Sequence, residues 1–581
     1  MSRVGSKQAK SRKQPTVISW RFAFVVLSVS AIFCTLIARA AYLQVVDPDK
    51  LVAEGDNRTL RVKSDDALRG MITDRNGEEL AVSVPVESIY ADSKVIIDNK
   101  VIEDQRRWFA LADMLQISPD ELKKKIATDK KKRYVYLERQ ASPATVDYIR
   151  KLKIPGIYFK QEAKRFYPSG EVTAHILGFT DLDDHGVEGV ERQFDKVLKG
   201  TAGRKVVRKD AKGREIEVIE EKGATPARNL TLSIDQRIQA VAYRELKKAV
   251  MTFGATSGSL VMVDVNTGEV LAMVNSPSYN PNNRTGVAVH RFRNRAITDT
   301  FEPGSTVKPL PVMAALENGT ADLKTVIATG NGVMMVGGRR VADTHAYGDQ
   351  DLAGIIRKSS NIGVTKLALN MPHEDLLKMY YGMGLGDETG LGIIGESGGM
   401  LRERARWSDH ERATLSFGYG LSVTAVQLAR MYAAIGNGGV VRPLTLLKQD
   451  KAPEGIRMVS EQTADAMVEM LEGVTLKGGT ATKAVVPGYR VGGKTGTAKK
   501  AIAGGYGDDY IGSFAGIGPI SSPRLACVVI INEPTGDYYY GGEVAAPVFS
   551  SVMGAAMRLL NIPPDGNDSR ITKVAGGPDA G

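Results

Sequence analysis

Near the middle of the chain lies the stretch Phe301-Glu302-Pro303-Gly304-Ser305-Thr306-Val307-Lys308-Pro309, which contains the only Ser-x-x-Lys in the sequence. If a helix begins near Gly304, Ser305 and Lys308 lie on one face, one turn apart. A serine hydroxyl at a helix N-terminus is a favoured nucleophile, and a lysine one turn on can take its proton if the lysine pKa is lowered. An isolated Ser-x-x-Lys is more often a helix cap beside a solvated lysine. The rest of the chain decides between these two interpretations.

Two further motifs follow in order. Ser359-Ser360-Asn361 stands in an apolar, helix-like segment, and Lys494-Thr495-Gly496-Thr497 stands in a strand-like run. Each motif alone is weak. A Ser-x-x-Lys, a Ser-x-Asn and a Lys-Thr-Gly in this order form the set that penicillin-binding proteins and class A β-lactamases use. The three together favour a serine acyltransferase over a helix cap.

These residue types suit acyl transfer. Ser305 would attack a carbonyl carbon and form an acyl-enzyme, with Lys308 as the base. Ser359 and Lys494 could pass a proton to the departing amine, and Lys494 would lower the pKa of Lys308 by like charge. Asn361 could hold Lys308 and an amide of the substrate.

The third motif offers groups for binding the substrate. The backbone N–H groups of the serine nucleophile and of Thr497 would form an oxyanion hole. Gly496 would let a strand edge approach the substrate, and the hydroxyls of Thr495 and Thr497 could bind a carboxylate. Glu302 and Tyr419 are further candidates for lining the cleft, although a purely structural role explains each of them equally well.

Composition excludes several classes of protein. The 581 residues are 43% hydrophobic and 25% charged, which is ordinary for a globular chain of two to four domains. Residues 1–21 contain six basic residues and no acidic residue. Taking these six from the formal charge of +11 leaves +5 on the rest of the chain. No basic stripe interleaved with aromatics indicates nucleic-acid binding. The two cysteines and six histidines show no disulfide pattern or metal-ligand spacing, so we expect no cofactor.

Residues 22–43 are predicted to be a transmembrane anchor. They are mostly apolar, and about 20 such residues span a bilayer. Trp20 and Tyr42 suit the two interfaces, and Arg39 can extend to the nearer one. The basic tail, residues 1–21, places the N-terminus in the cytoplasm and the rest of the chain on the far side. A cleaved signal peptide is the alternative, but the apolar run is longer than a usual signal core.

Residues 44–225 are predicted to form a pedestal or interaction domain without a catalytic cluster. Asn76-Gly77 between two strand-like runs predicts a hairpin. Helical patterns fill residues 100–152. Charged residues alternate with Val and Ile over residues 204–222, which is typical of exposed ribbon strands.

Residues 226–563 are predicted to form an α/β domain. Two early strands and three late strands would join into one sheet around a mainly helical segment, residues 290–485, giving an α/β sandwich with a helical insert. Residues 564–581 are rich in Pro, Gly and Asp and are predicted to be a disordered tail. The predicted strands are 259–265, 269–274, 489–499, 511–518 and 525–532, and the flanking helices are 235–253 and 546–560.

Over nearly its whole length the chain resembles the class B penicillin-binding proteins, which are peptidoglycan D,D-transpeptidases. Their N-terminal module is matched by Arg69-Gly70 with Asp74-Arg75-Asn76-Gly77, and by further residues around Tyr167 and Glu191. Tyr42-Leu43-Gln44 with Asp47-Pro48 most resembles the division-specific (septal) branch, as does the stretch 411–420. An elongation-type member of the class is the alternative.

The resemblance implies a penicillin-recognising serine transpeptidase fold of the α+β type. Its sheet would have five antiparallel strands, helices on both faces and an all-helical insert, on an elongated α+β pedestal. It also implies acylation by a D-Ala-D-Ala stem peptide, transfer to an amine acceptor and covalent inhibition by β-lactams. The implied location is the bacterial inner membrane, with the catalytic domain in the periplasm. The implied partners are a membrane glycosyltransferase and other division proteins.

Three other functions compete with this interpretation. The run Gly488–Thr495 fits the P-loop pattern of nucleotide-binding proteins, but a P-loop must open a helix at its Lys-Thr, and no helical stripe follows here. A β-lactamase shares the three motifs but needs neither an anchor nor a pedestal. An inactive membrane scaffold is disfavoured because Ser305, Lys308, Asn361 and Lys494 are all present.

Overall fold

The structure is a computed structural model that describes most of the chain. The predicted basic tail lies outside the described residues up to residue 18, and the predicted disordered tail lies outside them from residue 567. Asp47 and Pro48, part of the match to the division branch, also lie outside them. The described residues are 19–46, 53, 55–56, 59–65, 68–127, 133–201, 203–210, 214–223, 225–404, 406–502 and 504–566.

The chain divides into two compact units. The first is Met1–Ala67 with Thr201–Pro226, and the second is Leu68–Gly200 with Ala227–Gly581. Most of the predicted pedestal therefore shares a unit with the catalytic domain. The boundary predicted between residues 225 and 226 stays a prediction.

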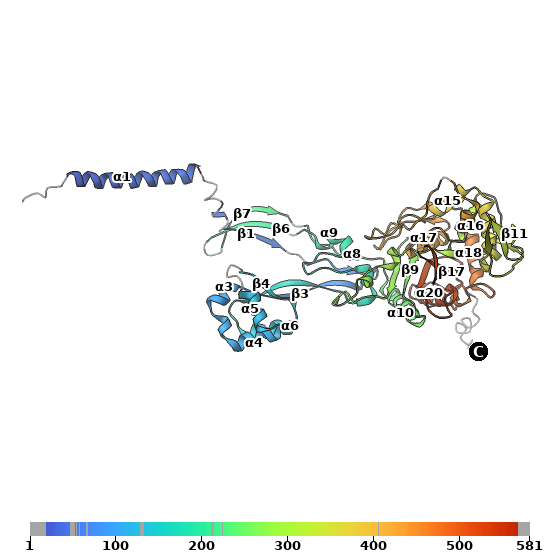
Figure 1. Ribbon diagram of the computed structural model, residues 1–581, viewed down its shortest axis with the longest axis horizontal. Helices are drawn as coiled ribbons and strands as arrows, with labels where there is room; N and C mark the ends of the chain where they lie inside the picture. Colours follow the sequence, from blue (N-terminus) through green and yellow to red (C-terminus); the bar gives the residue numbers. More distant parts are fainter. Residues whose placement is uncertain are drawn as a thin grey trace, which may run out of the picture. The chain divides into compact units, whose positions relative to one another are not determined.

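The first unit begins with an apolar helix, α1 (Ser19–Ala41), which continues as the π-helical turn η1 (Tyr42–Val46). Among the described residues this helix, blue in Figure 1, is the one long and apolar enough to cross a bilayer. None of its side chains is buried. The Arg39 guanidinium lies 5.6 Å from the Tyr42 ring centre, as expected near a membrane interface. This helix covers the predicted anchor.

The rest of the first unit is a three-stranded antiparallel sheet of order β1-β6-β7. The predicted ribbon strands at 204–222 are confirmed, and every residue of β7 is exposed. The strands are β1 (Leu60–Asp65), β6 (Gly203–Lys209) and β7 (Glu215–Lys222).

The amino-terminal part of the second unit is a sheet of order β4-β3-β2-β8, with β5 also paired to β3. The predicted hairpin at Asn76-Gly77 is confirmed: it joins β2 to β3, and Gly77 takes a φ of 92° in the turn. The strands are β2 (Ile72–Thr73), β3 (Glu79–Ala91), β4 (Val135–Ala141), β5 (Ile157–Phe166) and β8 (Leu230–Thr231).

Four helices pack with this sheet around a separate small core that includes Ile89, Leu111 and Val146. They are α3 (Ser93–Asp98), α4 (Gln105–Met114), α5 (Pro119–Ala127) and α6 (Pro143–Leu152), with the turn η2 (Val101–Glu103). Four short elements follow β5 in the sequence: η3 (Gly170–Val172), α7 (Ala174–Leu177), α8 (Gly189–Gln193) and α9 (Asp195–Lys199).

The predicted five-stranded antiparallel sheet is confirmed, with the order β10-β9-β19-β18-β17. Early and late strands join because β9 pairs with β19. The strand predicted at residues 489–499 starts later than expected, at Gly492, because Val486 and Tyr489 form a separate bridge before it. The strands are β9 (Ser257–Asp264), β10 (Val270–Ser276), β17 (Gly492–Ile502), β18 (Gly505–Gly518) and β19 (Leu525–Asn532).

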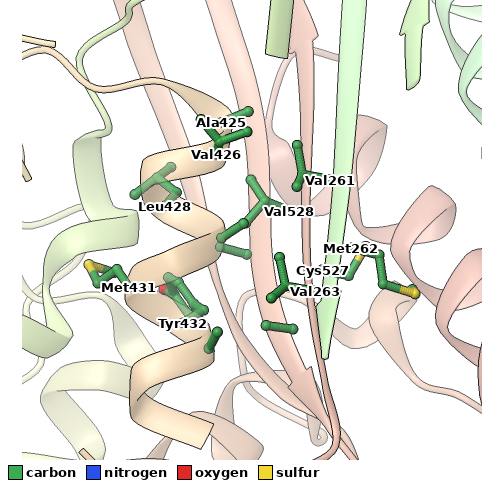
Figure 2. Packing of buried hydrophobic residues seen from close by; sticks show 14 of the residues in the cluster. Val261, Met262, Val263, Ala425, Val426, Leu428, Met431, Tyr432, Cys527 and Val528 are labelled. Carbon is green, nitrogen blue, oxygen red and sulfur yellow. The ribbon is translucent and has the colours of Figure 1, made fainter. Parts of the chain in front are cut away.

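Helices cover both faces of this sheet. On one face α17 (Ala425–Gly436) packs on β9 and β19, where Val261 and Val528 meet it (Figure 2). Met262, next along β9, points to the opposite side, because successive strand residues alternate. That side is covered by α10 (Gln236–Thr252) and α20 (Ala546–Leu559), which also pack on each other.

The insert between β10 and β17 is mainly helical, but the expected all-helical insert is wrong. It contains three two-stranded sheets, and one of them turns at Gly337-Gly338, where both glycines have positive φ. The strand pairs are β11 (Val326–Ala328) with β14 (Asp349–Asp351), β12 (Val333–Val336) with β13 (Arg339–Ala342), and β15 (Val440–Val441) with β16 (Ile456–Arg457). The helices and turns of the insert are η4 (Val289–Arg291), α11 (Arg295–Thr298), η5 (Gly304–Val307), α12 (Pro309–Glu317), α13 (Leu352–Lys358), α14 (Asn361–Leu369), α15 (His373–Gly382), α16 (Asp409–Ser416), α17, α18 (Glu461–Thr475) and η6 (Thr482–Ala484), and α19 (Gly541–Val544) precedes α20.

Candidate active site

The Ser-x-x-Lys stretch forms a short 3-10 turn, η5, that leads into the buried helix α12. The predicted helix start near Gly304 is right in position, but a tighter turn comes first, and Pro309 then occupies the first position of α12. Gly304 has a φ of 54°, and its N–H donates to the Gly418 carbonyl at 3.0 Å. Ser305 stays partly exposed at the start of these buried elements.

Lys308 is fully buried. Its Nζ donates to the Ser359 carbonyl at 2.5 Å, to the Ser359 Oγ at 3.1 Å and to the Asn361 Oδ1 at 2.6 Å. Among the described residues these are its hydrogen bonds, and none joins it to the Ser305 hydroxyl. These three acceptors replace the hydrogen bonds that the amine would make to water, which lowers the cost of burying it. The first two motifs therefore meet at one nitrogen atom.

The second motif lies where α13 ends and α14 begins. Ser359 ends α13 with a φ of 59°, a left-handed conformation that is uncommon for a residue other than glycine. The Ser360 hydroxyl then caps α14 by accepting the Gly363 N–H at 2.9 Å. The Asp343 carboxylate accepts hydrogen bonds from the Ser360 hydroxyl and from the Asn361 N–H. This carboxylate fixes the start of α14, and with it the side chain that holds Lys308.

The third motif lies on β17, directly beside η5. Lys494 is fully buried, and its Nζ lies 3.3 Å from the Thr495 carbonyl. A Cβ added at Gly496 would come within 2.3 Å of the Ser513 Oγ and 2.8 Å of a methyl carbon of Thr306. Glycine is therefore required for β17 to lie this close to the serine turn.

Burial lowers the pKa of both lysines, and like charge adds to this at Lys308. For Lys308, removal from water is the largest cause, Lys494 lowers the pKa further, and Asp343 acts in the opposite direction, so that the pKa lies well below its ordinary value. Burial lowers the pKa of Lys494 to about 7. Each amine thus reaches its neutral form far more readily than a solvated lysine, as a general base must.

Two family models match the sequence. The model of the penicillin-binding protein transpeptidase domain matches residues 258–554, and that of the penicillin-binding protein dimerisation domain matches residues 64–232. The peptidoglycan D,D-transpeptidase FtsI of Escherichia coli strain K12 is 50% identical over 560 residues, which cover 96% of this chain and 95% of the relative. The chain belongs to the class B penicillin-binding proteins.

Solved structures of penicillin-binding proteins agree. A peptidoglycan synthetase from Bifidobacterium adolescentis superposes with a TM-score of 0.70 at 27% identity, covering 88% of this chain and 98% of that one. The transpeptidase domain of Burkholderia pseudomallei penicillin-binding protein 3 gives a TM-score of 0.54 at 43% identity, covering 58% of this chain and 98% of that one. The predicted fold and the predicted enzyme class, a serine D-Ala-D-Ala transpeptidase, are confirmed.

In this penicillin-binding protein, Glu302 and Tyr419 lie next to the serine turn. The Glu302 Oε1 accepts the Gly420 N–H at 2.9 Å, and the Tyr419 ring packs edge-on against Tyr506 at 5.7 Å. Burial, and then the nearby Glu302 carboxylate, raise the pKa of Tyr419. Both residues thus lie beside the serine turn, while a role in lining a cleft or binding substrate stays a prediction.

Two residues of this site carry no signal in the sequence. Asp343 lies 17 residues before Ser360, in a segment without a motif, and only the fold brings its carboxylate to α14. Tyr432 is fully buried in α17, and its hydroxyl donates to the Thr306 carbonyl at 2.7 Å, which supports the serine turn from behind. A tyrosine in an apolar helical stripe gives no indication of such a partner.

The P-loop interpretation of Gly488–Thr495 is wrong. Lys494 and Thr495 lie inside β17, where they pair with Ala515 and Phe514 of β18. A P-loop needs these two residues at the start of a helix, with free backbone N–H groups facing a phosphate. Here the two residues lie within an extended strand, and no helix begins at them.

Proposed function

We propose that Ser305 is the nucleophile of this transpeptidase and that Lys308 is its general base. The observation that carries the proposal is the buried Lys308 amine, one turn from Ser305, with a pKa lowered by burial and by Lys494. In its neutral form the amine takes the hydroxyl proton as Ser305 Oγ attacks the carbonyl carbon of the D-Ala-D-Ala peptide bond. The C–N bond then breaks, and D-Ala leaves as an amine after it gains a proton.

Ser359 and Lys494 supply the route for that proton. Ser359 Oγ accepts from Lys308 Nζ, so its own hydroxyl proton can be passed on to the leaving amine. Lys494, with a pKa of about 7, can restore a proton to the site. Asn361 holds Lys308 through its Oδ1 and orients the base. An amine acceptor later attacks the acyl-enzyme, and the same groups work in reverse.

The backbone N–H groups of Ser305 and Thr497 serve as the oxyanion hole. The Thr497 Oγ1 accepts the Gly541 N–H at 3.1 Å, which leaves its hydroxyl proton available to the terminal carboxylate of the substrate. The Thr495 hydroxyl lies 3.0 Å from the Thr480 hydroxyl and can share in the same contact. Gly496 and Glu302 with Tyr419 border the cleft.

We infer that the enzyme cross-links stem peptides during septal wall synthesis and that β-lactams acylate Ser305. This is supported by the 50% identity, over 96% of this chain, to a relative that carries the name FtsI. The elongation role remains the alternative, and the two roles predict different positions in a dividing cell. Localisation of a fluorescent fusion to the division site would support the septal role.

We infer that α1 spans the inner membrane, with the N-terminus in the cytoplasm and the catalytic domain in the periplasm. This is supported by the basic residues before α1 and by the length of that helix. A membrane glycosyltransferase and other division proteins are the partners that class B membership suggests.

Labelled-penicillin capture tests the proposal. Wild type should form one stable adduct, and Ser305→Ala should form none while it unfolds at the same temperature as wild type. Ser550→Ala, a change on the surface of α20, is the matched control and should label like wild type. A rapidly lost adduct would indicate a β-lactamase, and labelling of Ser305→Ala would overturn the proposal.

A further inference from the structure

A polar cavity of about 470 Å³ lies in the second unit, and its lining includes none of the residues that surround Ser305. Its walls come from β4, from β5, from the loop at residues 180–182 and from the loop at 281–285 that follows β10. Two loops that are distant in sequence therefore close a space between the pedestal strands and the catalytic sheet. Its volume is typical of a site for a small ligand.

The lining of this cavity carries an excess of positive charge. It has four basic side chains, Arg139, Lys164, Arg165 and Arg284, and one carboxylate, Asp181. Arg139 is paired with Glu162 and Asp183, and Arg165 with Glu191, so the excess lies in Lys164 and Arg284. The Asp181 Oδ1 already accepts the N–H groups of its own turn. Within the described part of the chain, Lys164 and Arg284 form no ion pair. The cavity thus holds cations that the protein does not neutralise.

Two of the guanidinium groups are fixed in place. The Arg284 side chain donates to the carbonyls of Pro281 and Thr180, and it lies 4.1 Å from the centre of the Phe179 ring. Arg165 has a side chain only 1% exposed, and its Nε and Nη1 donate to Glu191 and Ser83. These contacts reduce the ordering cost of binding an anion.

The third nitrogen of Arg165 is left without a partner. Its Nη2 is buried and has no acceptor among the described residues. A buried N–H without an acceptor is costly unless water or a ligand supplies one. A planar guanidinium recognises a carboxylate well, because two parallel N–H groups match its two oxygens. The unpaired cations of Lys164 and Arg284 therefore suit a carboxylate, and the unpartnered nitrogen belongs to a further arginine of the same lining.

We propose that this cavity is a second binding site of the enzyme, for a carboxylate-bearing peptide with the chemistry of a peptidoglycan stem peptide. The amides of Gln140 and Asn282 and the hydroxyl of Thr285 add partners for peptide N–H and C=O groups. The choice of stem peptide rests on the proposed function, since the enzyme works on that polymer. The site itself rests on the charge and the geometry.

The test uses the full chain in detergent, with Ser305 first acylated by benzylpenicillin so that the catalytic cleft is occupied. The probe is the tripeptide L-Ala-γ-D-Glu-meso-diaminopimelate, which lacks the D-Ala-D-Ala bond and cannot acylate the enzyme. Calorimetry compares wild type with Lys164→Glu and Arg284→Gln. Lys248→Glu, an exposed charge reversal on α10, is the matched control.

Wild type and Lys248→Glu should bind the tripeptide saturably, and the two cavity variants should bind it roughly tenfold more weakly. The fully amidated tripeptide should bind wild type more weakly by a similar factor. Absence of saturable binding by wild type would overturn the proposal. So would binding of the tripeptide to both cavity variants as tightly as to wild type, or binding of the amidated peptide to wild type as tightly as the free acid. Equally tight binding of tri-L-glutamate would overturn the stem-peptide assignment. Penicillin labelling of the same samples reports separately on the proposed function.

Discussion

The Lys308 Nζ lies 2.6 Å from the Oδ1 of Asn361, a residue 53 positions further along the chain. This one contact joins a 3-10 turn to the start of α14. The strand β17, with a second buried lysine, lies beside that turn. A solvated lysine would need no such partner. The geometry therefore favours a buried base over a solvated lysine as the role of Lys308.

Asn361→Ala should slow the acylation of Ser305 by benzylpenicillin about 10- to 100-fold, because it removes a hydrogen bond from the catalytic amine, worth about 1.5–3 kcal/mol for a charged group. Stopped-flow measurement of the acylation rate checks this. Asn370→Ala, at the exposed end of the same helix, is the control and should acylate like wild type. Wild-type rates in Asn361→Ala would contradict the role given to Asn361.

Lys494→Met should abolish acylation yet raise the melting temperature of the protein at pH 7. The unfolded-state pKa of lysine is about 10.4, and burial lowers the folded pKa of Lys494 to about 7. Between these values the unfolded chain binds more protons, so wild-type stability falls as pH drops from about 10 to 7.

Melting curves of Lys494→Met and wild type at pH 7 and pH 10 check the sign of this effect. The stabilisation should be on the order of 1–3 kcal/mol at pH 7 and smaller at pH 10, because the neutral amine of wild type then costs less to bury. An equal difference at both pH values would show that the pKa of Lys494 is not lowered in the folded protein.

Asp343→Asn should extend acylation to lower pH. The Asp343 carboxylate raises the pKa of Lys308, so removing its charge should lower that pKa and keep the amine neutral in more acidic solution. The acid limb of the rate profile then moves to lower pH. Asp349→Asn, an exposed change in β14, should leave the limb in place. A shift to higher pH would contradict the electrostatic role of Asp343.

Ser359→Gly and Ser359→Ala should lose a similar amount of activity but differ from each other in stability. Both remove the hydroxyl that accepts from Lys308, so both should slow acylation to a similar extent. Glycine adopts a φ of 59° without strain, whereas alanine pays roughly 1–2 kcal/mol for the left-handed conformation. Chemical denaturation should therefore find Ser359→Gly the more stable variant. Equal stabilities would show that the residue relaxes out of this conformation.

Local patterns account for much of the fold that could be predicted. Asn76-Gly77 marked a hairpin, and short apolar runs marked β9, β18 and β19, because turn chemistry and burial act over a few residues. The small strand pairs of the insert were missed. They are two to four residues long, too short for a period to show.

For the site, the sequence supplied the residue types and the fold supplied the energetics. Ser305, Lys308 and Lys494 could be chosen from motifs, since spacing alone places a nucleophile beside an amine. The lowered pKa of Lys308 could not, because it depends on complete burial and on the approach of β17. Asp343 was missed because only the fold brings it to its partner Ser360, which is 17 residues away in the sequence.

The pH dependence of Ser305 acylation tests most directly whether Lys308 is a buried base. The rate of acylation by benzylpenicillin is measured from pH 5 to pH 11, with the adduct located at Ser305 by mass spectrometry. The account predicts a rate that rises through a midpoint well below the ordinary lysine pKa of about 10.4. A rate that is still rising near pH 10 would mean that Lys308 titrates as a solvated lysine, and would contradict the account.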